Sequence, residues 1–191
     1  MNNLLHKIEN LSNNFTADTV VEKIDTEGSV NCAVFFLFLK TSNEFSILLL
    51  KRSRNLNNHA GEICFPGGTY KSNDENLIET AFRETFEESG IRKEHIKWVS
   101  SLNYEDTKTG FRIYPFLGVI EKESIISIDN SEIVKYIIMP VIQLQEVLNL
   151  KKLWFIDKNN TLYSRPLFYF QNELVWGATA NIIYKFFRNT N

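Results

Sequence analysis

The sequence has few cysteines, and none of them is placed to form a metal site. Its 191 residues include two, Cys32 and Cys64. Both lie among apolar residues, and their spacing is not that of paired metal ligands. We expect them to be reduced thiols packed in the core of a protein of the cytoplasm, where thiols stay reduced.

The sequence also lacks a basic excess and a long apolar run. Its 21 basic and 23 acidic residues give a formal net charge of −2. A general nucleic-acid binder usually carries a basic excess, so we expect no nucleic-acid partner. The longest apolar run, residues 32–39, is far shorter than the roughly 20 residues that cross a bilayer. Residues 1–15 have neither a basic start nor a continuous apolar core, so we expect no secretion signal and no membrane association.

Apolar periodicity predicts strands interleaved with a few helices, and hence one mixed α/β domain with helices packed on a sheet. We expect this domain over residues 29–191, after a helical extension over residues 1–28 that packs on it. The predicted strands are 31–39, 45–50, 96–102, 111–121, 132–139, 155–156 and 167–170. The predicted helices are 74–89, which ends at Gly90, 141–148 and 179–187.

The helix predicted over 74–89 carries an acidic face beside its apolar face. At about 100° per residue, Glu84, Glu87 and Glu88 fall on one side. Like charges at this spacing cost a few tenths of a kcal/mol each, and Arg83 relieves part of that cost through Glu87. Carboxylate oxygens suit Mg²⁺ or Mn²⁺, although three glutamates alone can also form a solvated acidic face.

The segment before this helix changes the balance between those two interpretations. It reads Phe65-Pro66-Gly67-Gly68. The two glycines permit close approach of the backbone and expose a carbonyl as a candidate ligand. Bare backbone beside clustered carboxylates is a plausible site for a metal-bound pyrophosphate.

Residues 83–91, RETFEESGI, resemble the second half of the Nudix box, G-x5-E-x7-R-E-U-x-E-E-x-G-U, in which U is aliphatic. Thr85 stands in place of one aliphatic residue. Glu75 has the box spacing to Arg83, and Gly68 lies one residue farther away than the pattern asks. The chain is thus identified as a member of the Nudix superfamily. This resemblance implies an α/β/α sandwich with a mixed β-sheet.

Residues 48–68 are similar to the signature that precedes the box in coenzyme A pyrophosphatases, which also have the longer loop. Leu50 and Asn57 depart from it, since the signature has threonine and arginine there, and Arg54 is a candidate substitute for that arginine. The resemblance implies hydrolysis of coenzyme A or acyl-CoA to 4′-phosphopantetheine and adenosine 3′,5′-bisphosphate. The alternative is a Nudix hydrolase of ADP-ribose, dinucleotides or other nucleoside diphosphate derivatives.

The resemblance also implies roles for individual residues. Arg83 orients the glutamates, and the general base is Glu84 or, as second choice, Glu132. The expected ligands of Mg²⁺ or Mn²⁺ are Glu84, Glu87, Glu88 and the carbonyl of Gly67. The candidate contacts to substrate are Arg52, Arg54, His59 and Gly68. For His59 a solvated loop position is the alternative interpretation.

Two further functions stay open at this point. A non-catalytic Nudix-fold nucleotide sensor would be indicated by loss of the glutamates, and all three are present. An RNA-decapping role is disfavoured by the near-neutral charge. A homodimer is an assembly that the resemblance allows.

Overall fold

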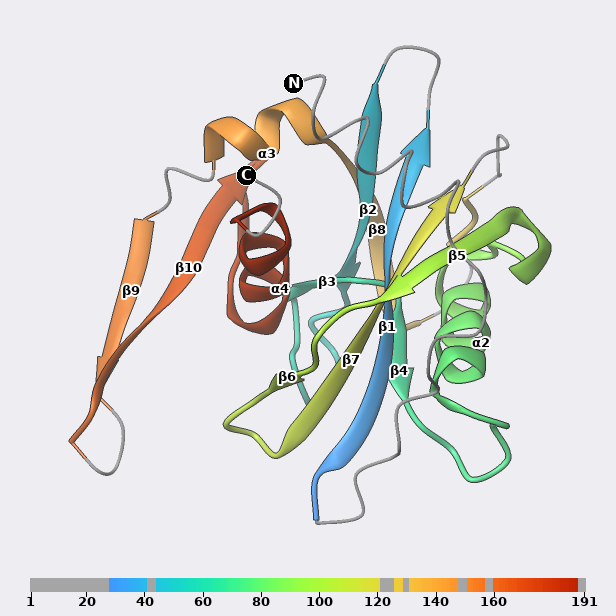
Figure 1. Ribbon diagram of the computed structural model, residues 1–191, viewed down its shortest axis with the longest axis horizontal. Helices are drawn as coiled ribbons and strands as arrows, with labels where there is room; N and C mark the ends of the chain where they lie inside the picture. The colour runs from blue at the N-terminus through green and yellow to red at the C-terminus, as the bar shows by residue number, and fades with distance from the viewer. Residues whose placement is uncertain are drawn as a thin grey trace.

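Strand β1 (Val30–Lys40) forms the centre of the fold in the computed structural model (Figure 1). The structure describes residues 28–40, 44–120, 126–128, 131–147, 151–156 and 160–188. β1 pairs in parallel with β7 (Phe111–Ile120) along nearly its whole length. On its other side it pairs antiparallel with β4 (Gly67–Thr69) near its start and with β2 (Phe45–Arg52) near its end. A strand covered on both faces explains the near-continuous apolar run.

The remaining strands extend this sheet in both directions. β2 also pairs with β3 (Ile63–Cys64) and β8 (Ile133–Pro140), and β7 pairs with β5 (Ile96–Ser101) and β6 (Glu105–Asp106). The result is one eight-stranded sheet with parallel and antiparallel pairs. The predicted mixed sheet is therefore confirmed.

Helices cover the two faces of this sheet. α2 (Leu77–Ser89) lies on one face and α4 (Gly177–Arg188) on the other (Figure 1). The alternation of side chains along β1 explains why: Phe35 packs against Phe82 of α2 at 4.8 Å between ring centroids, whereas Phe36 packs against Phe186 of α4 at 5.1 Å. Shorter helices, η1 (Lys93–His95) and α3 (Val141–Val147), follow α2 and β8. The α/β/α arrangement is confirmed.

Helix α2 starts at Leu77, three residues later than predicted, and ends as predicted. Its N-cap is Asn76, whose side-chain oxygen accepts a hydrogen bond from the Glu79 backbone N–H at 3.1 Å. The carboxylate of Asp74 does not cap the helix and instead accepts hydrogen bonds from Arg83. At the other end Gly90 has φ 69°, and its N–H donates to the Phe86 carbonyl at 2.9 Å.

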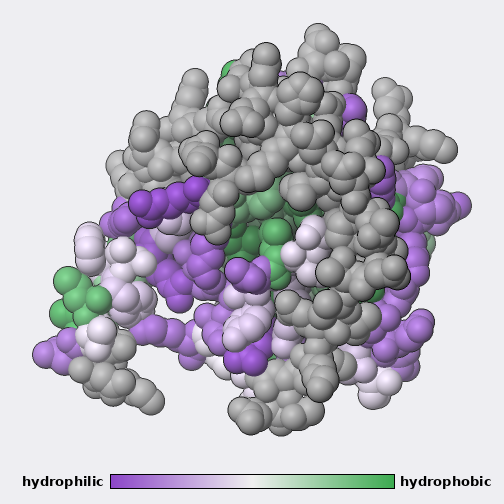
Figure 2. Space-filling model, viewed as in Figure 1, coloured by the Kyte–Doolittle hydropathy of each residue, from purple (hydrophilic) through white to green (hydrophobic). Residues whose placement is uncertain are grey.

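A second sheet follows the main one, and its strands extend well beyond the predicted ones. β9 (Lys151–Ile156), β10 (Leu162–Phe170) and β11 (Glu173–Val175) form an antiparallel unit. The β9–β10 hairpin projects from the molecule (Figure 1), and Figure 2 shows apolar surface at its outer end. Trp154, Ile156 and Leu162 are mostly exposed there. The inner part of β10 is buried, but the outer part of the hairpin buries neither face and has no clear alternating pattern, so its length could not be predicted.

Two buried or half-buried carboxylates connect this second sheet to the rest of the fold. Glu105 of β6 contacts Arg165 of β10 and Lys185 of α4, each at 2.6 Å. Glu173 of β11 contacts Lys51 of β2 at 2.5 Å and Lys135 of β8 at 2.7 Å. These long-range ion pairs fix the position of the hairpin base.

The extension predicted over residues 1–28 lies almost wholly outside the described residues, so the domain division stays a prediction. Within the described ranges, no helix is long and apolar enough to cross a membrane. Cys32 and Cys64 are free thiols, as expected, but both are only half-buried by surface area. Burial is the main cause that raises the pKa of both thiols, to about 12 for Cys64.

Candidate active site

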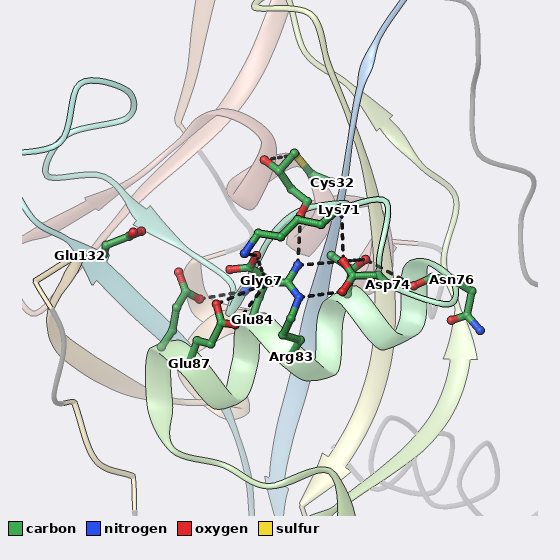
Figure 3. A network of polar contacts seen from close by, with 12 residues as sticks. Cys32, Gly67, Lys71, Asp74, Asn76, Arg83, Glu84, Glu87 and Glu132 are labelled. Carbon is green, nitrogen blue, oxygen red and sulfur yellow. Dashed lines mark hydrogen bonds and ion pairs between the residues drawn. The ribbon is translucent and has the colours of Figure 1, made fainter.

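Strand β4 brings two glycines against the acidic face of α2 (Figure 3). The Gly67 N–H donates to Glu88 Oε2 at 2.9 Å. A Cβ on Gly68 would lie 2.5 Å from Cδ of Glu84, and a Cβ on Gly67 would lie 2.3 Å from the carbonyl oxygen of Ala33. Only glycine allows these approaches. The backbone therefore meets the carboxylates as the sequence predicts.

Arg83 lies between two of the predicted glutamates. Its Nη1 is 2.5 Å from Oε1 of Glu84 and 3.3 Å from Oε2 of Glu87. Its Nη2 donates to the carbonyl of Thr69 on β4 at 3.3 Å. One guanidinium thus ties the acidic face of α2 to the glycine-bearing strand.

Asp74 holds Arg83 in place, and sequence reasoning missed it. Nε and Nη2 of Arg83 donate to its two oxygens at 2.7 and 2.8 Å. The carboxylate also accepts from the Thr80 hydroxyl at 2.8 Å and the Lys71 N–H at 3.0 Å. Hydrogen bonds from Arg83 hold the pKa of Asp74 well below its usual range. Glu75, which has the box spacing, is exposed. In the sequence Asp74 is an acid at the start of the predicted helix, and nothing local links it to Arg83 nine residues later.

Glu88 is the most buried of the three glutamates, with 5% of its surface exposed. Burial raises the pKa of Glu88 to about 8, and the nearby charges of Glu84 and Glu132 add to that rise. The Gly67 N–H and Arg52 oppose it. The Arg52 contact is loose, since Nη1 lies 3.7 Å from Oε1 of Glu88.

Arg52 also connects Glu132 to this group. Its Nη2 lies 3.9 Å from Oε2 of Glu132. The carbonyl of Glu132 accepts from the Ser53 N–H at 2.6 Å, which holds the start of β8 beside the end of β2. The Glu132 side chain is 58% exposed, and it lies across the site from α2 (Figure 3). The structure therefore places Arg52 and Glu132 near the carboxylates.

Arg54 and His59 lie on the loop between β2 and β3. The side chain of Arg54 passes over Gly61, where an added Cβ would lie 3.3 Å from its Cγ. His59 Nδ1 is 3.1 Å from Oε2 of Glu62, and its ring packs on Phe111 at 5.9 Å. Within the described part of the chain, neither residue pairs with the carboxylates of α2.

The donor set fits a hard divalent cation, although it is not assembled around one. Across the described ranges, no three His, Cys, Asp or Glu side chains form a ready-made metal centre. Arg83 draws Glu84 and Glu87 toward itself instead. Yet carboxylate oxygens are the ligands that Mg²⁺ and Mn²⁺ prefer, and Glu88 is a buried carboxylate with Nη1 of Arg52 3.7 Å from its Oε1. The chemistry of Glu84, Glu87 and Glu88 therefore fits a divalent cation.

The sequence profile of the NUDIX domain matches residues 31–161. The chain belongs to the Nudix family. It is similar to the uncharacterized Nudix hydrolase NudL of Pectobacterium atrosepticum, with 32% identity over 142 residues that cover 73% of this chain and 72% of the relative. Our protein is therefore an enzyme of the pyrophosphohydrolase class. Members of this class act on nucleoside diphosphate derivatives and generally use divalent cations.

Solved structures support the Nudix fold of this chain. The MutT/nudix family protein of Enterococcus faecalis aligns with a TM-score of 0.56 at 16% identity, covering 97% of this chain and 73% of that one. The MutT protein of Methanosarcina mazei aligns with a TM-score of 0.52 at 18% identity, covering 87% and 97%. At these identities the likeness shows the fold alone.

Replacing Asp74 with asparagine is expected to loosen the position of Arg83 and to lower both the stability and the activity of the enzyme. We expect a loss of about 2 kcal/mol in the free energy of unfolding, because a charged hydrogen-bond partner is removed, and a fall in kcat of about 10- to 100-fold. The pKa of Asp74 is depressed, so its contribution is present at neutral pH and lost as acid protonates the carboxylate. Urea unfolding and steady-state kinetics measure the two effects.

Asp106 provides the matched control. Its carboxylate accepts from Nε and Nη2 of Arg112 at 2.7 and 3.1 Å, but it is half-exposed and belongs to β6. Asp106→Asn should leave kcat unchanged and alter stability by less than about 1 kcal/mol. Equal kinetic losses in both variants would contradict a special role for Asp74.

Proposed function

We propose that this Nudix hydrolase cleaves the pyrophosphate bond of coenzyme A or an acyl-CoA, giving 4′-phosphopantetheine and adenosine 3′,5′-bisphosphate. The observation that carries the proposal is the course of residues 48–68. This signature-like segment leaves the core on β2 and places Arg52 3.7 Å from Glu88. It then returns through Gly61 to Gly67, which donates to the same Glu88.

The carboxylates of α2 would hold one or more divalent cations, with the carbonyl of Gly67 as a further candidate ligand. Such cations neutralise the non-bridging oxygens of a pyrophosphate and lower the pKa of an attacking water. Arg83, fixed by Asp74, would orient Glu84 and Glu87 for this purpose. Most of the rate acceleration would then come from positioning and charge stabilisation.

The geometry favours Glu132 over Glu84 as the general base. Glu84 has Nη1 of Arg83 at 2.5 Å and Nζ of Lys71 at 3.8 Å, and it packs against Gly68. These contacts engage Glu84 with cationic neighbours and the glycine backbone. Glu132 is exposed to water and lies across from the helix. We therefore propose Glu132 as the general base. Glu84 stays a candidate ligand of the cation, oriented by Arg83.

Glu132→Gln should lower kcat by about 10²- to 10⁴-fold, because a general base contributes that much. The affinity for Mn²⁺, measured by calorimetry, should change little. Glu94 is the control, since it is similarly exposed and pairs at 3.8 Å with Arg92 away from the site. If Glu132→Gln retains activity as Glu94→Gln does, the base lies elsewhere and Glu84 becomes the first choice.

A substrate panel tests the proposed reaction itself. Coenzyme A, an acyl-CoA, ADP-ribose, a dinucleotide and a nucleoside triphosphate would each be incubated with the protein and Mg²⁺ or Mn²⁺. The products would be identified by mass spectrometry. We expect 4′-phosphopantetheine from coenzyme A. Cleavage of ADP-ribose with coenzyme A untouched would overturn the substrate assignment and leave the reaction class in place.

A further inference from the structure

Among the described residues, the cationic side chains within 4 Å of the candidate catalytic carboxylates include Arg83, Arg52 and Lys71, which differ in exposure. Arg83 and Arg52 are each 22% exposed, whereas Lys71 is 54% exposed. Arg83 is engaged by Asp74, and Arg52 lies between Glu88 and Glu132. Lys71 therefore differs from both arginines, because its ammonium can leave its carboxylate without breaking a buried contact.

Lys71 is anchored through its backbone while its side chain is half-exposed. Its N–H donates to Asp74 Oδ2 at 3.0 Å, which fixes the loop between β4 and α2. Its Nζ lies 3.8 Å from Oε1 of Glu84, beyond hydrogen-bond distance. Figure 3 shows the side chain extending from this loop toward Gly67 and Glu84. A half-exposed pair at this distance contributes little, so it is easily exchanged.

We propose that Lys71 is a substrate-binding residue whose ammonium contacts a non-bridging phosphate oxygen of the pyrophosphate. The assignment rests on the proposed function in requiring a diphosphate at the carboxylates. A compact ammonium on a flexible stem suits a phosphate as a point charge. The single negative charge of Glu84 cannot neutralise both a divalent cation and Lys71. When cation and substrate are bound, the ammonium would therefore pair with the nearest remaining anion, the phosphate.

Binding of inorganic pyrophosphate in the presence of Mg²⁺ tests this role without depending on the substrate. Lys71→Met keeps the length of the side chain and removes its charge. We expect calorimetry to show about 10- to 100-fold weaker pyrophosphate binding, with Lys71→Arg restoring most of the loss. Lys93→Met is the control, because Lys93 is 57% exposed and pairs with Glu79 of α2 instead. That variant should bind as the wild type does.

The outcomes separate this proposal from the proposed function. Unchanged pyrophosphate affinity in Lys71→Met, with an altered Mg²⁺ affinity, would overturn it and leave Lys71 as a counter-ion of Glu84. With any cleaved substrate we expect KM to rise by a similar factor and kcat to change less. If no substrate is cleaved while Lys71→Met still loses pyrophosphate binding, the proposed function fails and the role of Lys71 stands. Circular dichroism would confirm that each variant is folded.

Discussion

Replacement of Glu87 by glutamine should remove hydrolysis almost entirely while the fold persists. Glu87 is half-exposed, and its Oε2 lies 3.3 Å from Nη1 of Arg83. Such a surface pair contributes little to stability. We propose the same carboxylate as a ligand of the cation, where its charge would stabilise the reaction. We therefore expect kcat to fall by at least about 100-fold, and the melting temperature to change by no more than about 2 °C.

The measurement is steady-state turnover of whichever substrate the panel identifies, together with thermal unfolding. Glu79→Gln is the matched control, because Glu79 lies in the first turn of the same helix and pairs with Lys93 instead. It should keep full activity. Unchanged turnover in Glu87→Gln would remove this helix face from the mechanism and favour a non-catalytic nucleotide sensor.

Replacement of Glu88 by glutamine should stabilise the metal-free protein at neutral to alkaline pH. Burial raises the pKa of Glu88 to about 8, against about 4.3 in an unfolded chain. The folded state thus binds the proton more tightly, so the free energy of unfolding of the wild type falls as the pH rises between these values. One pKa unit corresponds to about 1.4 kcal/mol, so the effect should reach a few kcal/mol. Glutamine carries no such charge and can still accept from the Gly67 N–H.

Urea unfolding in EDTA at pH 5, 6.5 and 8 measures this difference. We expect the two proteins to be closest at pH 5 and Glu88→Gln to be the more stable by the widest margin at pH 8. Addition of Mn²⁺ should stabilise the wild type and leave Glu88→Gln nearly unchanged. Parallel pH curves for wild type and Glu88→Gln would show that Glu88 stays ionised.

Local pattern was sufficient for the elements that are buried in a regular way. The run over residues 31–39 predicts β1 because a strand covered on both faces is apolar throughout. The 3.6-residue period predicts α2, and Gly90 predicts its end. The hairpin of β9 and β10 was largely missed, because its exposed face has no pattern that burial would impose.

In the candidate site, too, local pattern determined some features and tertiary structure determined the others. Residue spacing by itself determined that Glu84, Glu87 and Glu88 share one face of α2, since helix geometry depends only on local hydrogen bonds. Tertiary structure decided which of them is buried, that Asp74 and not Glu75 holds Arg83, and that Lys71 reaches Glu84. Those outcomes depend on how β4, its loop and the end of β2 pack around the helix. Burial and long-range contacts set charge and pKa, and no local pattern encodes them.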